Sequence, residues 1–433
     1  MQTPRTLSVL DRPITIEAAV SVVLCVILGA RINAVPFAPV AGLVGIALLP
    51  ALIPTIRRFR TIPTLLILLA VSLGAGVALT SFSSATHDTS MSLAISHSAM
   101  VVALIGGIAV LLFARAHIGT PWTAISYGAG MVGGIFLEPV SGSNAWRFTY
   151  SLPIAVLVLA ILSMRPRLAP QLLALVGLGV IGLVNDSRSN SAMLFLAAAI
   201  LLWQRFSRAV SKGRRRAGNI IGLILVAAGF FQLAQFSLLE GYFGEVSQDK
   251  TAAQIATSGS LLLGGRPEAS ASFAIIREYP LGLGSGTLPT GGDVTAAKTA
   301  MQQIGYDPNN GYVERFMFGS GIEVHSMLGD FWIWFGLAGL AACVVMVTTV
   351  VWGLEHRLRS AGLTALLAYL SVRFFWDLLF SPASSSMKFV TLTIALAAIA
   401  ITETTPAGLR ARDQLQQGAD ATVGVHSYPS MRR

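Results

Sequence analysis

Charged residues are scarce in this chain. They make up 12% of its 433 residues, whereas an ordinary soluble domain carries about 25%. Hydrophobic residues reach 54%, more than a water-soluble core can absorb. A membrane-spanning helix needs roughly 20 mostly apolar residues, and lipid tolerates no unpaired backbone groups. The composition therefore predicts an all-α, polytopic transmembrane protein.

Cysteine is nearly absent. The only two, Cys25 and Cys343, both fall inside apolar segments, where a free thiol packs like a small apolar side chain. We therefore expect no structural disulfide. The His, Cys, Asp and Glu residues also show no metal-ligand spacing, so we expect no metal and no other cofactor.

Two further absences bear on function. The chain has no repeat at a fixed short period, and no pair of interrupted spans at matching positions in its two halves, which is the pattern of many secondary transporters. The formal net charge is +10, but the Lys and Arg residues lie in short patches between apolar segments. We read these patches as topology determinants and expect no nucleic-acid partner.

What the chain does contain is a series of apolar segments, about 12 in all. The fifth is Gly-rich, and those at 150–164 and 190–204 are short for a bilayer. The segments are 14–30, 38–55, 63–83, 97–114, 120–138, 150–164, 168–184, 190–204, 217–238, 327–353, 362–380 and 387–402.

The loops between these segments differ in charge. Short cytoplasmic loops accumulate Lys and Arg, and alternate loops here do so. With the N-terminus inside, the short outer loops hold only Arg31, Arg147 and Arg188, with Lys388 at the outer edge of the last segment. We expect a multi-pass protein of the cytoplasmic membrane, with both termini in the cytoplasm. The inner basic residues are Arg5, Arg12, Arg57, Arg58, Arg60, Arg115, Arg165, Arg167, Arg205, Arg208, Lys212, Arg214, Arg215, Arg216, Arg357, Arg359 and four Arg of the tail.

The same assignment puts a long polar stretch, 239–326, outside the membrane as part of a membrane domain of residues 1–402. Loops longer than about 15 residues are uncommon unless they are functional or disordered. We expect a mostly helical cap with helices at 251–263 and 266–278, and turns at Gly291-Gly292 and Asn309-Asn310-Gly311. Residues 403–433 are polar and predict a disordered cytoplasmic tail.

Two outer arginines are candidates for binding phosphate, because the guanidinium fork matches phosphate oxygens. Arg188 lies in a tight connection between two spans, and the alternative is a partner for Asp186 or for a lipid headgroup. Arg266 follows two glycines in the outer loop, and the alternative is a solvated surface charge. The Gly282-x-Gly284-x-Gly286 run of the same loop predicts a flexible turn and not a dinucleotide site.

His325 stands where the long loop re-enters the membrane. A neutral imidazole at that boundary is suited to take a proton from a hydroxyl group near neutral pH, and the alternative is a structural hydrogen-bonded residue. Arg373 and Asp377 lie four residues apart in the segment 362–380. They predict either a structural ion pair within the membrane or a contact to an anionic lipid substrate.

The segment 325–340, HSMLGDFWIWFGLAGL, resembles a motif of the O-antigen ligase and O-antigen polymerase superfamily. That motif is a His-Asn-x-x-Leu-Glu block followed by Gly-Leu-x-Gly, and here Ser326 replaces the Asn and Asp330 the Glu. Further segments resemble the family's Ser-Arg-Gly, its Gly-Arg with a later Pro-Leu-x-Gly-x-Gly, and its Asn-Pro-Asn. They are Ser187-Arg188-Ser189, Gly265-Arg266 with Pro280-Leu281-Gly282-x-Gly284-x-Gly286, and Ser143-Asn144.

The resemblance implies a metal-independent, inverting glycosyltransferase of the GT-C type. Such an enzyme takes a glycan from a polyprenyl-pyrophosphate carrier and joins it to a hydroxyl of a lipid or glycan acceptor on the outer face of the membrane. His325 is then the general base. Arg188, Arg266, Arg373 and Asp330 are candidates for the substrate site, with Asp330 also a candidate to orient the imidazole. The alternative function is a transporter or flippase of a lipid-linked or anionic solute.

Overall fold

The computed structural model describes residues 15–137, 144–165, 167–207, 215–240, 245–258 and 266–404. The predictions for Arg5 and Arg12, for Ser143, for Gly264-Gly265 and for the tail beyond Thr404 lie outside these ranges.

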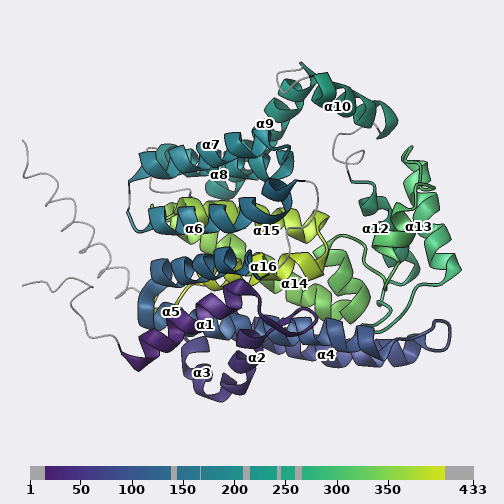
Figure 1. Cartoon of the computed structure of the whole chain (residues 1–433), viewed down its shortest axis with the longest axis horizontal. Helices are drawn as coiled ribbons and strands as arrows, with labels where there is room; N and C mark the ends of the chain where they lie inside the picture. The colour runs from purple at the N-terminus through teal and green to yellow at the C-terminus, as the bar shows by residue number, and fades with distance from the viewer. Residues whose placement is uncertain are drawn as a thin grey trace, which may run out of the picture.

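The described chain is almost entirely helical, as its composition predicts (Figure 1). Its strands, β1 (Asn33–Val35) and β2 (Ala38–Pro39), form one short antiparallel hairpin. The main helices are α1 (Ile16–Ala30), α2 (Val40–Ala47), α3 (Leu49–Ile56), α4 (Ile62–Ser83), α5 (Met91–Gly134), α6 (Ser151–Ser163), α7 (Leu168–Val184), α8 (Arg188–Ser207), α9 (Arg215–Leu239), α10 (Glu245–Ser258), α12 (Glu268–Glu278), α13 (Gly291–Gln303), α14 (Met327–Arg359), α15 (Ala365–Phe380) and α16 (Ala383–Ala397). The short turns are η2 (Trp146–Tyr150), η3 (Val313–Met317) and η4 (Ile401–Thr404).

Membrane-length helices occur where the hydropathy predicts them. Among the described residues, four helical stretches are long and apolar enough to cross a bilayer: α4, α5, η2 with α6, and α14. Shorter apolar helices include α1, α7 and α16. The chain is thus an all-α protein with membrane-spanning character.

One expected span takes a different form in the structure. The segment 38–55 divides into the short helices α2 and α3. The segments 97–114 and 120–138 lie in two helices that meet within α5 at a kink at Gly119, where φ is 78° and ψ is 163°. A positive φ is accessible to Gly without steric cost, so this glycine lets the chain change direction between the two helices.

Small residues bring the first helices close to α5. A Cβ atom on Gly106 of α5 would lie 1.8 Å from the Gly42 carbonyl oxygen of α2, and one on Gly29 of α1 would lie 2.1 Å from the Tyr127 carbonyl oxygen of α5. Lipid supplies no hydrophobic force between helices, so close packing of small residues is a main source of their association. These contacts fix α1 and α2 on α5.

We predict that Gly106→Ala lowers the free energy of unfolding by about 1–3 kcal/mol, because backbone atoms must move to admit the methyl group. Gly133→Ala in the same helix is the matched control, since nothing lies within 4 Å of its added Cβ. Thermal unfolding midpoints of both variants in neutral detergent measure the effect. Equal midpoints for Gly106→Ala and the unchanged protein would contradict the packing argument.

The long loop forms a helical cap at one end of the bundle. Figure 1 shows α12 and α13 side by side there. The expected helix 266–278 is confirmed as α12, and the expected helix 251–263 overlaps α10 as far as its last described residue. The prediction of a turn at Gly291-Gly292 is wrong, because these two residues begin α13. Thr290 and Asp293 close a capping box there, which satisfies the first backbone amides of the helix.

The cap is fastened to the bundle by buried polar contacts. The fully buried Asp293 accepts a hydrogen bond from the Tyr279 hydroxyl at 2.9 Å, and its second carboxylate oxygen lies 3.3 Å from Nε2 of His87. His87 belongs to the link between α4 and α5. The cap and the bundle are therefore one packed unit at this point.

The Gly282–Gly286 segment is packed rather than flexible, so that prediction is wrong. Gly284 has φ 108°, and a Cβ on it would lie 2.2 Å from the backbone nitrogen of Thr80. Its amide donates to the Ile333 carbonyl oxygen, and the Ser285 carbonyl oxygen lies 2.7 Å from Nδ1 of the buried His97. The glycines let the loop pass between α4, α5 and α14. The loop is thereby packed against the first turns of α14.

Candidate functional site

His325 lies on a chain of hydrogen bonds in the cap. Its Nδ1 is 2.7 Å from the hydroxyl of Tyr312, and that hydroxyl donates to Oε1 of Glu268 at 2.6 Å. Its Nε2 is 3.1 Å from the carbonyl oxygen of Phe316. The imidazole therefore connects the start of α12 and the region around η3 with the loop before α14.

The positions of protons follow from these partners. The Phe316 carbonyl oxygen only accepts, so the contact at Nε2 needs a proton on that nitrogen. Tyr312 has a single proton, which it gives to Glu268, so the contact at Nδ1 needs a proton there too. All three bonds are satisfied together when His325 is an imidazolium and Glu268 a carboxylate. The network is thus complementary to the protonated form of His325.

Burial opposes that charge. It lowers the pKa of His325, the nearby Arg266 lowers it further, and Glu268 together with the Phe316 carbonyl group raises it. The net direction is downward, so the free imidazole is neutral at neutral pH. Burial, and then Glu268, raise the pKa of Tyr312, so that its hydroxyl stays protonated. A neutral base surrounded by groups that match its protonated form is the arrangement that general-base catalysis needs.

The backbone at His325 is held in an unusual conformation. Its φ is 56°, in the left-handed region that non-glycine residues seldom adopt. The adjacent Val324 amide donates to Oδ1 of Asp330 at 2.8 Å, and the Ser326 hydroxyl accepts from Gly329, which caps α14. Fixed residues on both sides therefore aim the imidazole toward Tyr312.

Asp330 binds backbone amides and not the imidazole of His325. It is fully buried, and its two carboxylate oxygens accept hydrogen bonds from the backbone amides of Val324 and Ala383, each at 2.8 Å. Both oxygens serve the backbone and neither contacts the imidazole, so the prediction that Asp330 orients it directly is wrong. Asp330 ties the residue before His325 to the start of α16.

Arg266 lies beside this network. Its guanidinium carbon is 5.1 Å from the centre of the Trp376 ring of α15, a cation–π distance. Its positive charge lowers the pKa values of both Tyr312 and His325. The structure therefore brings together the two loop residues that the sequence analysis selected independently, Arg266 and His325.

Arg373 and Asp377 form the ion pair that their spacing predicts. Arg373 Nε is 3.2 Å from Oδ2 of the buried Asp377. The guanidinium carbon also lies 4.4 Å from the centre of the Phe389 ring of α16. Arg266 stacks on Trp376. Trp376 belongs to the same turn of α15 as Arg373.

Arg188 lies at the start of α8 and pairs with Asp186, as one of its two interpretations predicts. Its Nε is 3.0 Å from Oδ1 of Asp186, and Arg147 approaches the other oxygen at 4.0 Å. No contact joins Arg188 to His325. Two residues further along α8, however, Asn190 accepts a hydrogen bond from Tyr369 of α15 at 2.6 Å, which fixes this end of α8 against the helix of Arg373.

Glu268 and Tyr312 were not predicted to belong to the site. They lie 44 residues apart, and a single Glu or Tyr in a polar loop carries no local pattern. The remaining acidic and sulfur-containing groups do not add a metal centre: no cluster of three His, Cys, Asp or Glu residues that could hold an ion occurs within the described ranges.

The site is thus a cluster of an imidazole, a phenol, a carboxylate and a guanidinium group, from His325, Tyr312, Glu268 and Arg266. The ring of Trp376 lies against the guanidinium group. Comparisons with family models, with curated proteins and with solved structures find no match to this chain.

Proposed function

We propose that this chain is a membrane glycosyltransferase. It transfers a glycan from a polyprenyl-pyrophosphate carrier to a hydroxyl group of a lipid or glycan acceptor, on the outer face of the cytoplasmic membrane. The observation that carries the proposal is the meeting of Arg266 with the Glu268–Tyr312–His325 network. The motif resemblance at 325–340 supports the same reaction.

The chemistry requires a base and fixed positive charge. As the acceptor oxygen bonds to the anomeric carbon, the bond from that carbon to the pyrophosphate oxygen breaks, and the pyrophosphate leaves with the electron pair. His325 takes the acceptor's proton at Nε2, which turns from the Phe316 carbonyl oxygen toward the hydroxyl. Arg266 stabilises the charge that develops on the leaving group.

The network completes this step. Before reaction, Nδ1–H donates to Tyr312, Tyr312 donates to Glu268, and Nε2 carries a lone pair for the acceptor. After proton transfer the imidazolium can donate at both nitrogens: Nδ1–H keeps its bond to Tyr312, and once the product leaves, Nε2–H returns to the Phe316 carbonyl oxygen. The bonds from Nδ1 through Tyr312 to Glu268 are present throughout, and they strengthen as positive charge forms on the base.

The topology proposed with this function has about 12 spans, cytoplasmic termini and an external cap. One set of contacts supports the assignment of the loops to the two sides of the membrane. The expected inner residues Arg58, Phe59 and Arg115 meet the C-terminal end of α16, where Arg115 donates to the Ala398 carbonyl oxygen at 3.0 Å and Arg58 accepts from the amide of Ile401.

A cysteine introduced at Gly291 should react with a membrane-impermeant thiol reagent in intact cells, whereas one at Ser360 should react only after the membrane is opened. Gly291 is exposed, and an added Cβ there meets no atom within 4 Å, so the protein tolerates the change. Cys25 and Cys343 are buried and give a low background. The opposite labelling pattern would invert the topology.

The His325 pKa provides a test of the network with two variants of opposite effect. Glu268→Gln removes a charge that raises the pKa, so the pKa should fall further. Arg266→Gln removes a charge that lowers it, so the pKa should rise. Because the unchanged protein already has a lowered pKa, its base form persists through the neutral range and is lost only when the pH falls through that value.

Carbon-13 NMR of histidine-labelled protein measures these pKa values directly, since the chain holds only six histidines. His325→Ala assigns the resonance. Shifts of the same sign in both variants, or no shift, would show that Glu268 and Arg266 do not act electrostatically on the imidazole in membranes.

The fate of the donor tests the function itself. Membranes that lack this protein should accumulate the polyprenyl-linked glycan on their outer face, and purified protein should restore transfer to the acceptor. Accumulation on the inner face would instead support the flippase alternative. The buried Arg373–Asp377 pair would then mark the solute path.

A further inference from the structure

The hydrogen-bond chain from His325 to Glu268 is complete in two different arrangements of its protons. In one, His325 is an imidazolium, and the Tyr312 hydroxyl donates to Oε1 of Glu268 at 2.6 Å. In the other, Glu268 is a carboxylic acid that donates to the Tyr312 oxygen, and Tyr312 donates to Nδ1 at 2.7 Å. Nε2–H donates to the Phe316 carbonyl oxygen in both. The two arrangements therefore hold the same number of protons and differ only in where those protons lie.

Tyr312 connects the two arrangements. Its oxygen contacts both Nδ1 of His325 and Oε1 of Glu268, and these two atoms lie 4.0 Å from each other, too far for a direct hydrogen bond. When Nδ1 passes its proton to the phenol oxygen, the phenol passes its own proton to Glu268. Burial and the contact with Glu268 raise the pKa of Tyr312, which disfavours a phenolate, so the two protons move together.

The surroundings of Glu268 favour a proton on its carboxyl group. The residue is 8% exposed, and its second oxygen, Oε2, is buried with no hydrogen-bond partner within the described part of the chain. A buried carboxylate needs partners for its oxygens, because its charge has lost its hydration. The carbonyl oxygen of a carboxylic acid carries no formal charge and loses less. The unpartnered Oε2 is therefore better accounted for by the acid than by the carboxylate.

Arg266 disfavours a lasting charge on the imidazole. Its guanidinium group lowers the pKa of His325, because two neighbouring cations repel each other. Between these two described residues, Arg266 and Glu268, no ion pair is formed that would hold the carboxyl group in its charged form. A proton that moves on from His325 to Glu268 relieves the repulsion and leaves Arg266 as the cation of the site.

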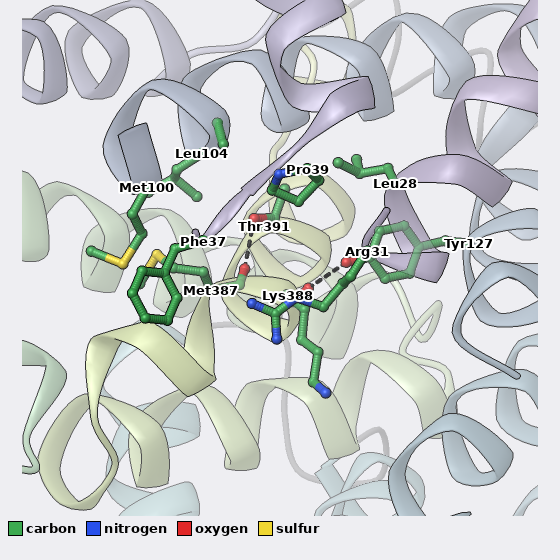
Figure 2. A pocket seen from close by; sticks show the side chains of 11 residues that line it. Leu28, Arg31, Phe37, Pro39, Met100, Leu104, Tyr127, Met387, Lys388 and Thr391 are labelled. Carbon is green, nitrogen blue, oxygen red and sulfur yellow. Dashed lines mark hydrogen bonds between the residues drawn. The ribbon is translucent and has the colours of Figure 1, made fainter. Parts of the chain in front are cut away.

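The tyrosine of a second polar pocket shows what such a relay needs. That pocket lies between the β1–β2 hairpin, α5 and α16 and has a volume of about 20 Å³, room for about one water molecule. Figure 2 shows its Tyr127, whose hydroxyl donates to the backbone carbonyl oxygen of Lys388 at 2.8 Å. The described lining residues include no imidazole and no carboxyl group. Tyr127 thus has nowhere to pass a proton, whereas Tyr312 lies between a base and an acid.

We propose that Glu268 receives, through Tyr312, the proton that His325 removes from the acceptor hydroxyl. The acceptor proton moves to Nε2, the Nδ1 proton moves to the Tyr312 oxygen, and the Tyr312 proton moves to Oε1 of Glu268. Three bonds to hydrogen break and three form, and His325 ends neutral with its proton on Nε2. The same steps in reverse return the proton to water at Nε2 after the product leaves. The source of the proton rests on the proposed function, whereas the two arrangements of the network do not.

The network is tested on the purified full chain in neutral detergent, without substrate, by lowering the pH until one proton enters it. Infrared spectra should then show the C=O stretching band of a carboxylic acid, and this band should be absent from Glu268→Gln. Nitrogen-15 NMR of histidine-labelled protein should show His325 change from the Nδ1–H to the Nε2–H tautomer while it stays neutral. His325→Ala assigns the resonances. Glu278→Gln is the matched control, because it removes an exposed carboxylate of the same helix, α12, and should keep the band.

Tyr312→Phe separates the relay from a direct effect of charge. It keeps the ring but removes the oxygen that joins Nδ1 to Oε1. In this variant the entering proton should stay on His325, so that both ring nitrogens are protonated and the change of tautomer is lost. Unfolding midpoints in the same detergent establish that each variant is folded.

Two results would overturn the relay. The unchanged protein could show both nitrogens of His325 protonated with no Glu268 band at the same pH, which would leave the proton on the imidazole. Alternatively, Tyr312→Phe could keep the change of tautomer, which would mean that the proton does not pass through Tyr312. Glycan transfer is measured separately: transfer by a protein whose His325 becomes an imidazolium would refute the relay alone, and a working relay in a protein without transfer activity would refute the proposed function.

Discussion

Replacing His325 with alanine is expected to lower the turnover of glycan transfer by roughly 10²–10⁴-fold while the lipid-linked donor still binds. The base acts on the acceptor hydroxyl, whereas the arginines recognise the pyrophosphate. Its two hydrogen-bond partners, Tyr312 and the Phe316 carbonyl group, remain in the variant. Single-turnover transfer and donor binding, measured on the same purified variant, separate the two effects.

A structural role for His325 makes a different prediction, because the residue also bridges Tyr312 and Phe316. Its loss would then reduce the amount of folded protein in the membrane instead of the rate per molecule. His117→Ala is the matched control, since His117 also contacts a backbone carbonyl oxygen, that of Phe113 at 2.8 Å, but lies outside the site. An abundant and active His325→Ala variant would end the proposal for His325.

Local patterns predicted most of the helices and the candidate residues themselves. Hydropathy depends on neighbouring residues only, so α4 and α7 begin and end within one residue of the expected segments. The start of α14 is also as expected, but the helix continues to Arg359, beyond the expected end at residue 353. The Arg373–Asp377 pair follows from helical spacing alone. His325 and Arg266 were selected by their position in the chain and by the motif resemblance, and their proximity was found only in the structure.

Contacts between distant segments account for what the sequence analysis missed. The Gly282–Gly286 run was expected to be flexible because glycine lowers the cost of turning. Its packing depends on Thr80, whose hydroxyl accepts from the Gly286 amide 206 residues away. Tyr312 and Glu268 were missed for the same reason. The start of α13 could have been found locally, since Thr290 and Asp293 have the spacing of a capping box.

The Arg266→Lys variant is expected to lose nearly as much activity as Arg266→Ala, a loss on the order of 2–4 kcal/mol in transition-state stabilisation. The reason is geometric. The planar guanidinium lies over Trp376 at 5.1 Å and can also present two N–H groups to a pyrophosphate, whereas the ammonium of lysine is a point charge on a flexible chain.

Rates of transfer at saturating acceptor, measured over a range of donor concentrations, test this expectation. Arg277→Lys is the matched control because Arg277 is an exposed cation in the last turn of α12, and it should keep full activity. If the loss arises from pyrophosphate recognition in the transition state, the Arg266→Lys variant should be impaired in turnover as well as in donor affinity. Full activity of Arg266→Lys would show that only a positive charge is needed at this position, and the bidentate contact proposed for the leaving group would have to be abandoned.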